Sequence, residues 1–293
     1  MWTPKTGKWI NPRYAVKDTP EAQHRFATSF LDKQDYNRAR LEFKSLIRHF
    51  PQSAWAPDAQ IGIAQTYEAE GDYYQAFLEY RRALQTYPSL SRVDEIIERE
   101  FHIGELFLKG QKRKLLGSAE IIPAQDKAVE IFQAILDDAP YAKLGDAAQF
   151  KLGESYKVLG KFEDAKAAFE HLPERYPNSP LVDRARFEIA SSAKGASLSP
   201  AYDQAGTEQA LQAFAKFKEE FPASPLGVEV DHEVASLIER RAEQAFEVAQ
   251  FYERQRALES ARIYYQDIVA HYAETPWAAK AQARLQALGS VVQ

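Results

Sequence analysis

The feature that most constrains this chain is a repeat within its sequence. The segments from Ala59 to Pro88 and from Ala148 to Pro177 carry the same kinds of residue at the same offsets. These residues are Ala64, Tyr67, Gly71, Tyr73, Ala76, Tyr80 and Pro88 in the first segment, and Gly153, Tyr156, Gly160, Phe162, Ala165, Phe169 and Pro177 in the second. One such unit cannot bury its apolar face alone, so neighbouring units must stack on each other.

The pattern extends, with fewer of its positions filled, over most of the remaining chain. Its residues are Ala27, Phe30, Tyr36, Ala39, Phe43 and Pro51 in a first unit, Gly104, Phe107, Ala128, Phe132 and Pro140 in a third, Ala190, Ala210, Phe214 and Pro222 in a fifth, and Ala249, Tyr252, Ala261 and Tyr265 in a sixth. Apolar residues between the prolines recur every three or four positions, which is a helix period. We expect about six helix pairs, at residues 19–51, 52–88, 89–140, 141–177, 178–222 and 223–273.

This pattern resembles the tetratricopeptide repeat, in which small residues let two antiparallel helices approach closely. The resemblance implies an all-α fold, a right-handed superhelical solenoid closed by a C-terminal capping helix. Pro51 and Pro88 lie 37 positions apart, more than the usual repeat of about 34, and we expect the first helix of a pair to hold the extra residues. Wider proline spacings predict surface loops inserted at 111–123 and 195–206.

The expected organisation is one solenoid over residues 19–288, with its cap at 275–288. An extended arm over 1–18 precedes it, and a tail over 289–293 follows it. A single long helix is expected from Leu226 to about Gln255, because no helix-stopping residue interrupts the apolar period there. The basic stretch from Lys109 to Lys114 fits a solvated loop, and a contact with a partner or an anionic lipid remains open.

Composition excludes several classes of function. The 37 Lys and Arg are outnumbered by 42 Asp and Glu, for a net charge of -5, so the chain lacks the overall basic character of nucleic-acid binders. It contains no cysteine, which excludes disulfides, zinc-thiolate sites and cysteine nucleophiles from this sequence. The six histidines lie in different repeats without ligand spacing, and no phosphate loop or nucleophile motif occurs. We therefore expect no enzyme, no metal and no cofactor.

Counting along the pattern selects two sets of residues on the inner face of the first helices. The residues three positions before the first small residue are His24, Ile61, Phe101, Phe150 and Phe187, and the residues one position after it are Thr28, Gln65, Glu105, Glu154 and Ser191. In this fold that face lines a concave groove able to hold an extended peptide, although packing between repeats would also explain the apolar residues. The second set lacks the Lys and Asn residues of carboxylate-clamp cochaperones, which favours unfolded hydrophobic segments as ligands.

The last third of the chain resembles the BamD family, the tetratricopeptide lipoproteins of the outer-membrane β-barrel assembly machinery. Residues 238–281 place a long helix before Phe251 and Tyr252, then a helix ending at Tyr272 and a restart at Thr275, Pro276 and Trp277. The resemblance implies a non-catalytic scaffold on the periplasmic face of the outer membrane. It would bind a BamA-like subunit through its C-terminal half and unfolded outer-membrane proteins through its N-terminal repeats. The docking candidates are Arg254, Arg256, Arg262, Tyr264 and Gln266.

The chain departs from the BamD pattern in two respects. It carries a helix pair beyond the usual five, and it lacks the lipid-bearing N-terminal cysteine. We hypothesise that Met1 replaces a removed signal and cysteine, because residues 2–20 resemble a tether behind a lipid anchor; that anchor would be the only membrane attachment. The alternative function is that of another periplasmic or cytosolic repeat adaptor that mediates protein contacts in the cell envelope.

Overall fold

The computed structural model describes residues 2–3, 8–9, 16–114, 121–122, 124–197 and 204–290. These residues are helical except for short connections and two antiparallel pairs of two-residue strands. β1 (Trp2–Thr3) pairs with β2 (Lys8–Trp9), and β3 (Arg113–Lys114) pairs with β4 (Ile121–Ile122). The chain divides into two compact units, residues 1–161 and 162–293, and each unit is described by itself.

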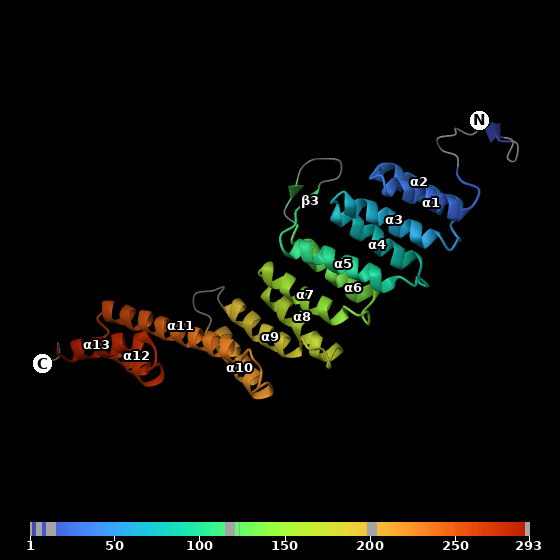
Figure 1. The fold of residues 1–293 in the computed structure, drawn as a ribbon. Helices are drawn as coiled ribbons and strands as arrows, with labels where there is room; N and C mark the ends of the chain where they lie inside the picture. The colour runs from blue at the N-terminus through green and yellow to red at the C-terminus, as the bar shows by residue number, and fades with distance from the viewer. Residues whose placement is uncertain are drawn as a thin grey trace. The chain divides into compact units, whose positions relative to one another are not determined.

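The first unit is a stack of helices that follow one another in chain order (Figure 1). They are α1 (Pro20–Leu31), α2 (Tyr36–His49), α3 (Ala56–Ala69), α4 (Tyr73–Thr86), α5 (Val93–Leu108), α6 (Asp126–Asp138) and α7 (Gly145–Val158). Each helix packs on the next, and α1 also contacts α3, α4 contacts α6, and α5 contacts α7. Contacts between corresponding helices of successive pairs are what a stacked repeat array requires.

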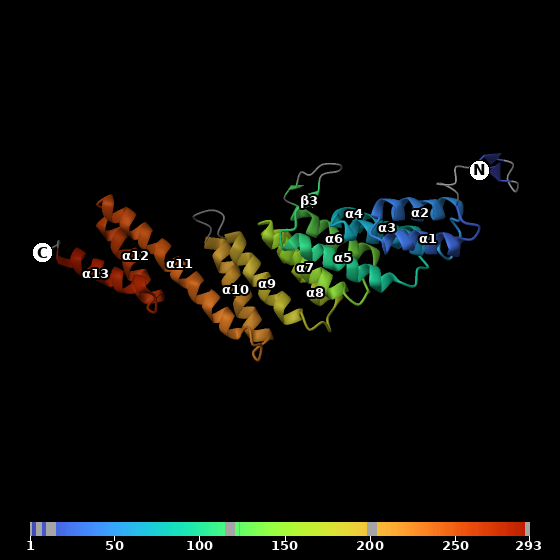
Figure 2. The same ribbon diagram turned by 45° about the horizontal axis from the view of Figure 1, so that its top comes forward.

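The second unit is organised around one long helix. Its helices are α8 (Phe162–Arg175), α9 (Val182–Ser197), α10 (Gln204–Glu220), α11 (Gly227–Arg254), α12 (Leu258–His271) and α13 (Pro276–Ser290). The 28-residue α11 contacts α10 along one part of its length and α12 and α13 along another (Figure 2). The predicted long helix and the predicted capping helix are both confirmed, and the fold is an all-α solenoid of helix pairs.

Two helices lie within each of the six predicted repeat ranges. That all of residues 19–288 form one continuous body remains a prediction. The loop expected at 195–206 is shorter than predicted, because α9 continues to Ser197 and α10 begins at Gln204. Leu115 and Leu116, and most of the arm over 1–18, lie outside the described residues. In the part of the chain that the structure describes, no helix is long and apolar enough to cross a membrane.

In the two units with a 37-residue spacing the extra residues do not lengthen the first helix, so the expectation was wrong for these units. α3 and α4 have 14 residues each, and the longer segment is the connection between pairs, such as residues 50–55 between α2 and α3. There Pro51 stops the helix, and two turns follow: the Ser53 amide donates to the Phe50 carbonyl at 3.1 Å, and the Ala56 amide donates to the Ser53 carbonyl at 3.0 Å. Proline has no amide hydrogen to donate to the helix, which favours a helix end here, and the two turns lead the chain to the start of α3.

The turn inside a helix pair places one residue in the left-handed backbone region. Gly71 and Gly160 have φ angles of 73° and 70°, which glycine adopts without steric conflict. Gln34 and Arg256 stand at the corresponding turns with φ angles of 61°, where a side chain costs about 1 to 2 kcal/mol. The glycine of the repeat pattern is therefore the signature of this turn, and two turns form without it.

The core is built as the repeat pattern predicts, with aromatic rings packed against small residues. Ala64 and Ala76 are fully buried, and the rings of Phe43 and Tyr80 are 1% exposed. At Gly62, a β-carbon would lie 2.5 Å from the Phe43 ring. This approach is too close for any side chain larger than that of glycine, unless the ring moves.

Candidate functional site

The apolar residues predicted to line a groove lie mainly in the core. Ile61, Phe150 and Phe187 are 1%, 7% and 3% exposed, so they pack inside their own units. Phe101 is half-buried and meets the Phe132 ring edge-on, with the ring centroids 5.5 Å apart. Such burial supports packing as the role of these side chains, and peptide contact by any of them remains an untested prediction.

His24 and Thr28 lie instead in a shallow depression of about 750 Å³ on α1, which Lys17, Phe26 and Asp32 also line. The His24 ring is half-buried and lies 4.9 Å from the Trp55 ring and 5.6 Å from the Phe43 ring, centroid to centroid. Burial lowers the pKa of His24 below its ordinary value, because a low-dielectric environment disfavours the charged form. The imidazole is thus neutral at pH 7.

Gln65 lines a separate cleft of about 400 Å³ between the first helices of the first three pairs. Its walls come from α1, α3, α4 and α5, and its lining residues are Leu31, Gln65, Glu68, Ala69, Tyr73, Arg99 and His102. Apolar and charged side chains alternate here, so the cleft can contact both the side chains and the polar backbone of an extended peptide. Glu105 and Glu154 are half-buried outside it, and Glu154 pairs with Lys151 at 2.6 Å.

Glu68 is the polar centre of this cleft. Its carboxylate accepts a hydrogen bond of 2.7 Å from the Tyr80 hydroxyl and forms an ion pair of 3.2 Å with Arg99. Burial, and then the adjacent Glu68 charge, raise the pKa of the Tyr80 phenol, which therefore stays protonated as the donor. Tyr80, Glu68 and Arg99 come from α4, α3 and α5, so the cleft has a rigid floor and a half-exposed guanidinium at its rim.

The sequence analysis missed Glu68 and Arg99, although a signal for them exists. In four of the six repeats the second aromatic residue after the turn is phenylalanine, and in two it is tyrosine, Tyr80 and Tyr265. A buried phenol requires a hydrogen-bond acceptor. The residue four positions after the small residue of the first helix is Glu68 in one of these repeats and Glu253 in the other. Tyrosine in place of phenylalanine thus marks the repeats that hold this carboxylate.

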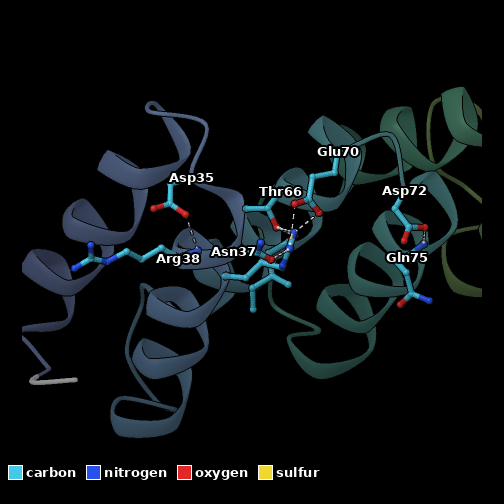
Figure 3. Close-up of polar contacts among 9 residues, drawn as sticks. Asp35, Asn37, Arg38, Thr66, Glu70, Asp72 and Gln75 are labelled. Carbon is cyan, nitrogen blue, oxygen red and sulfur yellow. Dashed lines mark hydrogen bonds and ion pairs between the residues drawn. The ribbon is translucent and has the colours of Figure 1, made fainter. Parts of the chain in front are cut away.

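Arg40 joins the first helix pair to the second beside this cleft. Its guanidinium donates to both carboxylate oxygens of Glu70, at 2.6 and 3.1 Å, and to the hydroxyl of Thr66 at 3.3 Å. It also donates to the Asn37 side chain at 2.6 Å. Figure 3 shows Thr66 and Glu70 of α3 facing Asn37 of α2 across these bonds. A two-pronged arginine to carboxylate contact fixes distance and angle together, so it holds α2 and α3 in register.

The predicted docking residues gather at the turn between α11 and α12 in the second unit. Arg254, Arg256 and Gln266 are exposed, Tyr264 is 36% exposed, and Arg262 lies 3.7 Å from Glu259. Three further side chains belong to the same region and were not predicted: Phe251, Tyr252 and Ile263. We call these eight residues the turn surface: Phe251, Tyr252, Arg254, Arg256, Arg262, Ile263, Tyr264 and Gln266.

The turn surface is apolar and aromatic at a solvated position. Phe251 is 51% exposed and Ile263 is 65% exposed. The ring of Tyr252 stacks on that of Tyr264, with centroids 5.5 Å apart and planes at 17°. Aromatic residues and arginine are the residue types enriched where proteins bind each other tightly. Exposed apolar side chains gathered with arginines indicate a protein-binding surface.

The turn surface stands on a rigid base formed by α11, α12 and α13. Glu253 of α11 accepts a hydrogen bond of 2.9 Å from the Tyr265 hydroxyl and pairs with Arg284 of α13. Burial raises the pKa of Tyr265 to about 12. Burial alone would raise the pKa of the Glu253 carboxyl, but the hydrogen bonds from Arg284 and Tyr265 outweigh it, and this pKa is lowered. This is the Tyr80, Glu68 and Arg99 arrangement repeated.

The described residues contain no group of three or more His, Cys, Asp or Glu side chains that could hold a metal ion. Among them, the strongly buried carboxyl of Glu100 lies in the core of α5 and faces no cleft.

Stacked helix pairs with small residues buried against aromatic rings define a tetratricopeptide repeat protein. A family model described as an outer membrane lipoprotein, YfiO, matches residues 17–98 and 124–289. The chain belongs to this family, the BamD-like branch of the repeat superfamily. Proteins of this class are non-enzymatic interaction scaffolds, so the chain is a protein-protein interaction adaptor, and its family is one of the cell envelope.

Solved repeat proteins are similar to the chain at low sequence identity. A tetratricopeptide repeat protein from Parabacteroides merdae is 16% identical over 86% of this chain and 93% of its own, with a TM-score of 0.36. Part of a repeat protein from Cytophaga hutchinsonii is 13% identical over 90% and 88%, with a TM-score of 0.38. A thermophilic repeat protein of Thermus thermophilus is 16% identical over 75% and 98%, with a TM-score of 0.34. No curated protein matches the chain.

Proposed function

We propose that this protein is a non-catalytic scaffold of the outer-membrane β-barrel assembly machinery, held at the periplasmic face of the membrane. In this role it binds a BamA-like subunit with the turn surface and unfolded outer-membrane protein segments with the first unit. The observation that carries the proposal is the exposed aromatic and arginine cluster at the α11 to α12 turn, in a chain of the outer membrane lipoprotein family.

Arg256 supports docking through the turn surface. It holds a left-handed backbone conformation with φ of 61°, at a position after the first helix where three other repeats have a glycine with positive φ: Gly71, Gly110 and Gly160. Glycine would relieve strain of about 1 to 2 kcal/mol at this position. An exposed arginine at such a position is explained if its side chain contributes to binding.

Binding of unfolded segments is assigned to the cleft around Gln65. It offers Leu31, Ala69 and Tyr73 as apolar contacts, and Arg99 is 45% exposed at its rim. A short apolar surface beside one cation suits an extended chain that carries apolar side chains and a carbonyl or carboxylate group. Ile61, Phe150 and Phe187 are buried in the cores of their own units, and none of them lines this cleft.

The first experiment tests docking by recovery of a partner from membranes. The tagged chain is purified from detergent-solubilised envelopes, and we expect an outer-membrane barrel protein with periplasmic domains to accompany it. The double variant Phe251→Ser and Ile263→Ser should lose this partner. Tyr141→Ser with Val228→Ser is the matched control, because these side chains are 87% and 80% exposed elsewhere. A chain recovered without a barrel protein would refute the proposal and favour another envelope adaptor.

The second experiment tests the cleft with a photoactivatable residue. The probe is placed at Gln65, and the ligand is a synthetic peptide with the sequence of a transmembrane strand of an outer-membrane barrel. Crosslinking should be strong there and weak at the matched position Gln133, which is exposed on α6 outside the cleft. Equal yields at both positions would show that the peptide does not select the cleft.

A further inference from the structure

The outer face of α2 carries a basic stripe that nothing above explains. Arg38, Lys44 and Arg48 are exposed along this helix, and Leu41 lies among them at 63% exposure. The four side chains line a broad depression of about 670 Å³. Ten residues separate the first arginine from the last, which is about 15 Å of helix. We call Arg38, Leu41, Lys44 and Arg48 the basic stripe.

The charges of the basic stripe are not neutralised by neighbouring carboxylates. Within the described residues, none of its three cations forms an ion pair. The nearest acids on the helix are engaged otherwise: Asp35 caps the helix by accepting from the Arg38 amide, and buried Glu42 accepts from Gln23 at 2.8 Å. In Figure 3 the Arg38 side chain points away from Thr66 and Glu70, and its guanidinium lies 4.3 Å from the centre of the Phe30 ring.

The basic stripe belongs to a wider asymmetry of charge along the chain. Residues 1–55 contain ten Lys and Arg and five Asp and Glu, whereas the whole chain contains 37 and 42. The first repeat with the preceding arm therefore carries a net charge of +5, and the remainder carries -10. A cationic end on an acidic protein directs that end toward an anionic partner.

We propose that the basic stripe of α2 binds the surface of an anionic phospholipid bilayer. The headgroup phosphates would contact Arg38, Lys44 and Arg48, and Leu41 would enter the interface between headgroups and acyl chains. This contact goes beyond the assembly scaffold function, because it uses a different face from the turn surface and the cleft. It would orient the first repeat on the membrane, independently of any lipid anchor.

Two observations select a bilayer over an acidic protein. First, cations that flank a leucine on one exposed helix face form the pattern of helices that lie in a membrane interface. Secondly, residues 1–15 contain Lys5, Lys8 and Arg13 but no acidic residue, together with two tryptophans and a tyrosine. Tryptophan, tyrosine, lysine and arginine are the residues that concentrate at the edges of a bilayer.

The test uses flotation of the full chain with lipid vesicles. Vesicles of phosphatidylcholine with about 30% phosphatidylglycerol should bind the protein, and pure phosphatidylcholine should bind it weakly. Each cation near an anionic surface contributes about five-fold to the binding constant. The triple variant Arg38→Gln, Lys44→Gln and Arg48→Gln should therefore bind on the order of 100-fold more weakly. Raising the salt from about 0.1 M to 0.5 M should weaken binding by the wild type more than binding by the variant, which has three fewer cations.

The matched control removes the same charge elsewhere. Lys161→Gln, Lys166→Gln and Arg175→Gln change three cations in or next to α8 that form no ion pair within the described residues, and this variant should float like the wild type. Equal losses in the two variants would overturn the proposal, because they would show a response to net charge alone. Binding without dependence on phosphatidylglycerol would overturn it as well.

Two further measurements separate other anionic partners. If the chain binds polyglutamate as tightly as it binds the vesicles, or if the triple variant abolishes self-association in sedimentation, the basic stripe is a protein-binding face and the proposal is wrong. Circular dichroism verifies that both triple variants keep their helix content. The stripe variant should still recover the barrel partner, so failure here is distinguishable from failure of the scaffold function.

Discussion

Glu100 of α5 is the most informative residue to change, because it is a fully buried carboxyl without a partner. Within the described residues, neither of its side-chain oxygens forms a hydrogen bond. Burial, with the charge of Asp138 adding to it, raises the pKa of this carboxyl well above its ordinary value; the Arg81 guanidinium, which pairs with Asp138 at 2.8 Å, opposes the shift. The side chain is therefore held in its protonated form.

In the two preceding repeats, the residue at the position equivalent to Glu100 is a hydrogen-bonded glutamine. Four residues before the small residue of the first helix, the preceding repeats have Gln23 and Gln60. Their side-chain amides donate to the backbone carbonyls of Glu42 at 3.1 Å and Glu79 at 3.2 Å. Glu100→Gln would restore such a donor without a titratable group.

The expected gain follows from the linkage between protonation and folding. The unfolded carboxyl ionises near its ordinary pKa of 4.5, whereas the folded one resists ionisation, so the wild type loses stability as the pH rises above about 4.5. Each pH unit removes about 1.4 kcal/mol while the folded carboxyl stays protonated, which limits the loss to about 3 kcal/mol at pH 7. Glu100→Gln should therefore stabilise the protein at pH 7 by about 1 to 3 kcal/mol.

The assay is urea unfolding followed by circular dichroism, at pH values from 4.5 to 8. The difference between Glu100→Gln and the wild type should shrink toward pH 4.5, where the carboxyl is protonated in both states. Glu188→Gln is the control: this carboxyl is 5% exposed but pairs with Arg184 at 2.9 Å, so its loss should destabilise. The reasoning fails if Glu100→Gln is neutral or destabilising at pH 7, or if its effect does not vary with pH.

Three further predictions concern the turns and the packing. Gly62→Ala should destabilise the first unit by about 1 to 3 kcal/mol, because the new β-carbon would lie 2.5 Å from the Phe43 ring. An unchanged urea midpoint for this variant would contradict the close packing of Gly62 against Phe43. Arg256→Gly should raise the free energy of unfolding by up to about 1 kcal/mol, because the relief of backbone strain is partly offset by the greater flexibility of glycine in the unfolded chain. The same variant should recover less of the partner. A gain in both stability and partner recovery would show that the arginine has no binding role. Tyr265→Phe should lower the free energy of unfolding by about 1 kcal/mol, because it removes the hydrogen bond to Glu253. The pKa of Tyr265 is about 12 in the folded protein, above that of the unfolded chain. The stability that the Tyr265 hydroxyl contributes should therefore be present at neutral pH and vanish between about pH 10 and 12. A destabilisation by Tyr265→Phe that is the same at all pH values would contradict this reasoning.

The fold was predictable because its determinants are local and repeated. Ala27, Ala64 and Gly153 mark one helix of a pair, and glycine at the turn with proline at the end marks its limits. The length of the first helix was predicted wrongly because the period alone does not say where extra residues lie. In the structure, the hydrogen bonds of the Ser53 and Ala56 amides form the turns between α2 and α3 in which the extra residues lie.

The candidate site was less predictable, because exposure can change along one face of a helix, where residues four positions apart lie one above the other. Ile61 was selected by its offset and lies in the core, whereas Gln65, four residues further on, lines the cleft. Exposure at the turn surface depends on how α11, α12 and α13 pack, which the repeat pattern does not encode. The arginines there were identified by resemblance, and the exposed Phe251 and Ile263 only by the structure.

The most direct test of the scaffold function is the affinity of the purified full chain for the periplasmic domains of a BamA-like barrel protein, measured by titration calorimetry. We expect a dissociation constant in the micromolar range or tighter, typical of a specific interface. The Phe251→Ser and Ile263→Ser variant should bind at least about ten-fold more weakly, and the Tyr141→Ser and Val228→Ser control should bind like the wild type. No binding by the wild type, or equal binding by all three proteins, would contradict the proposed function.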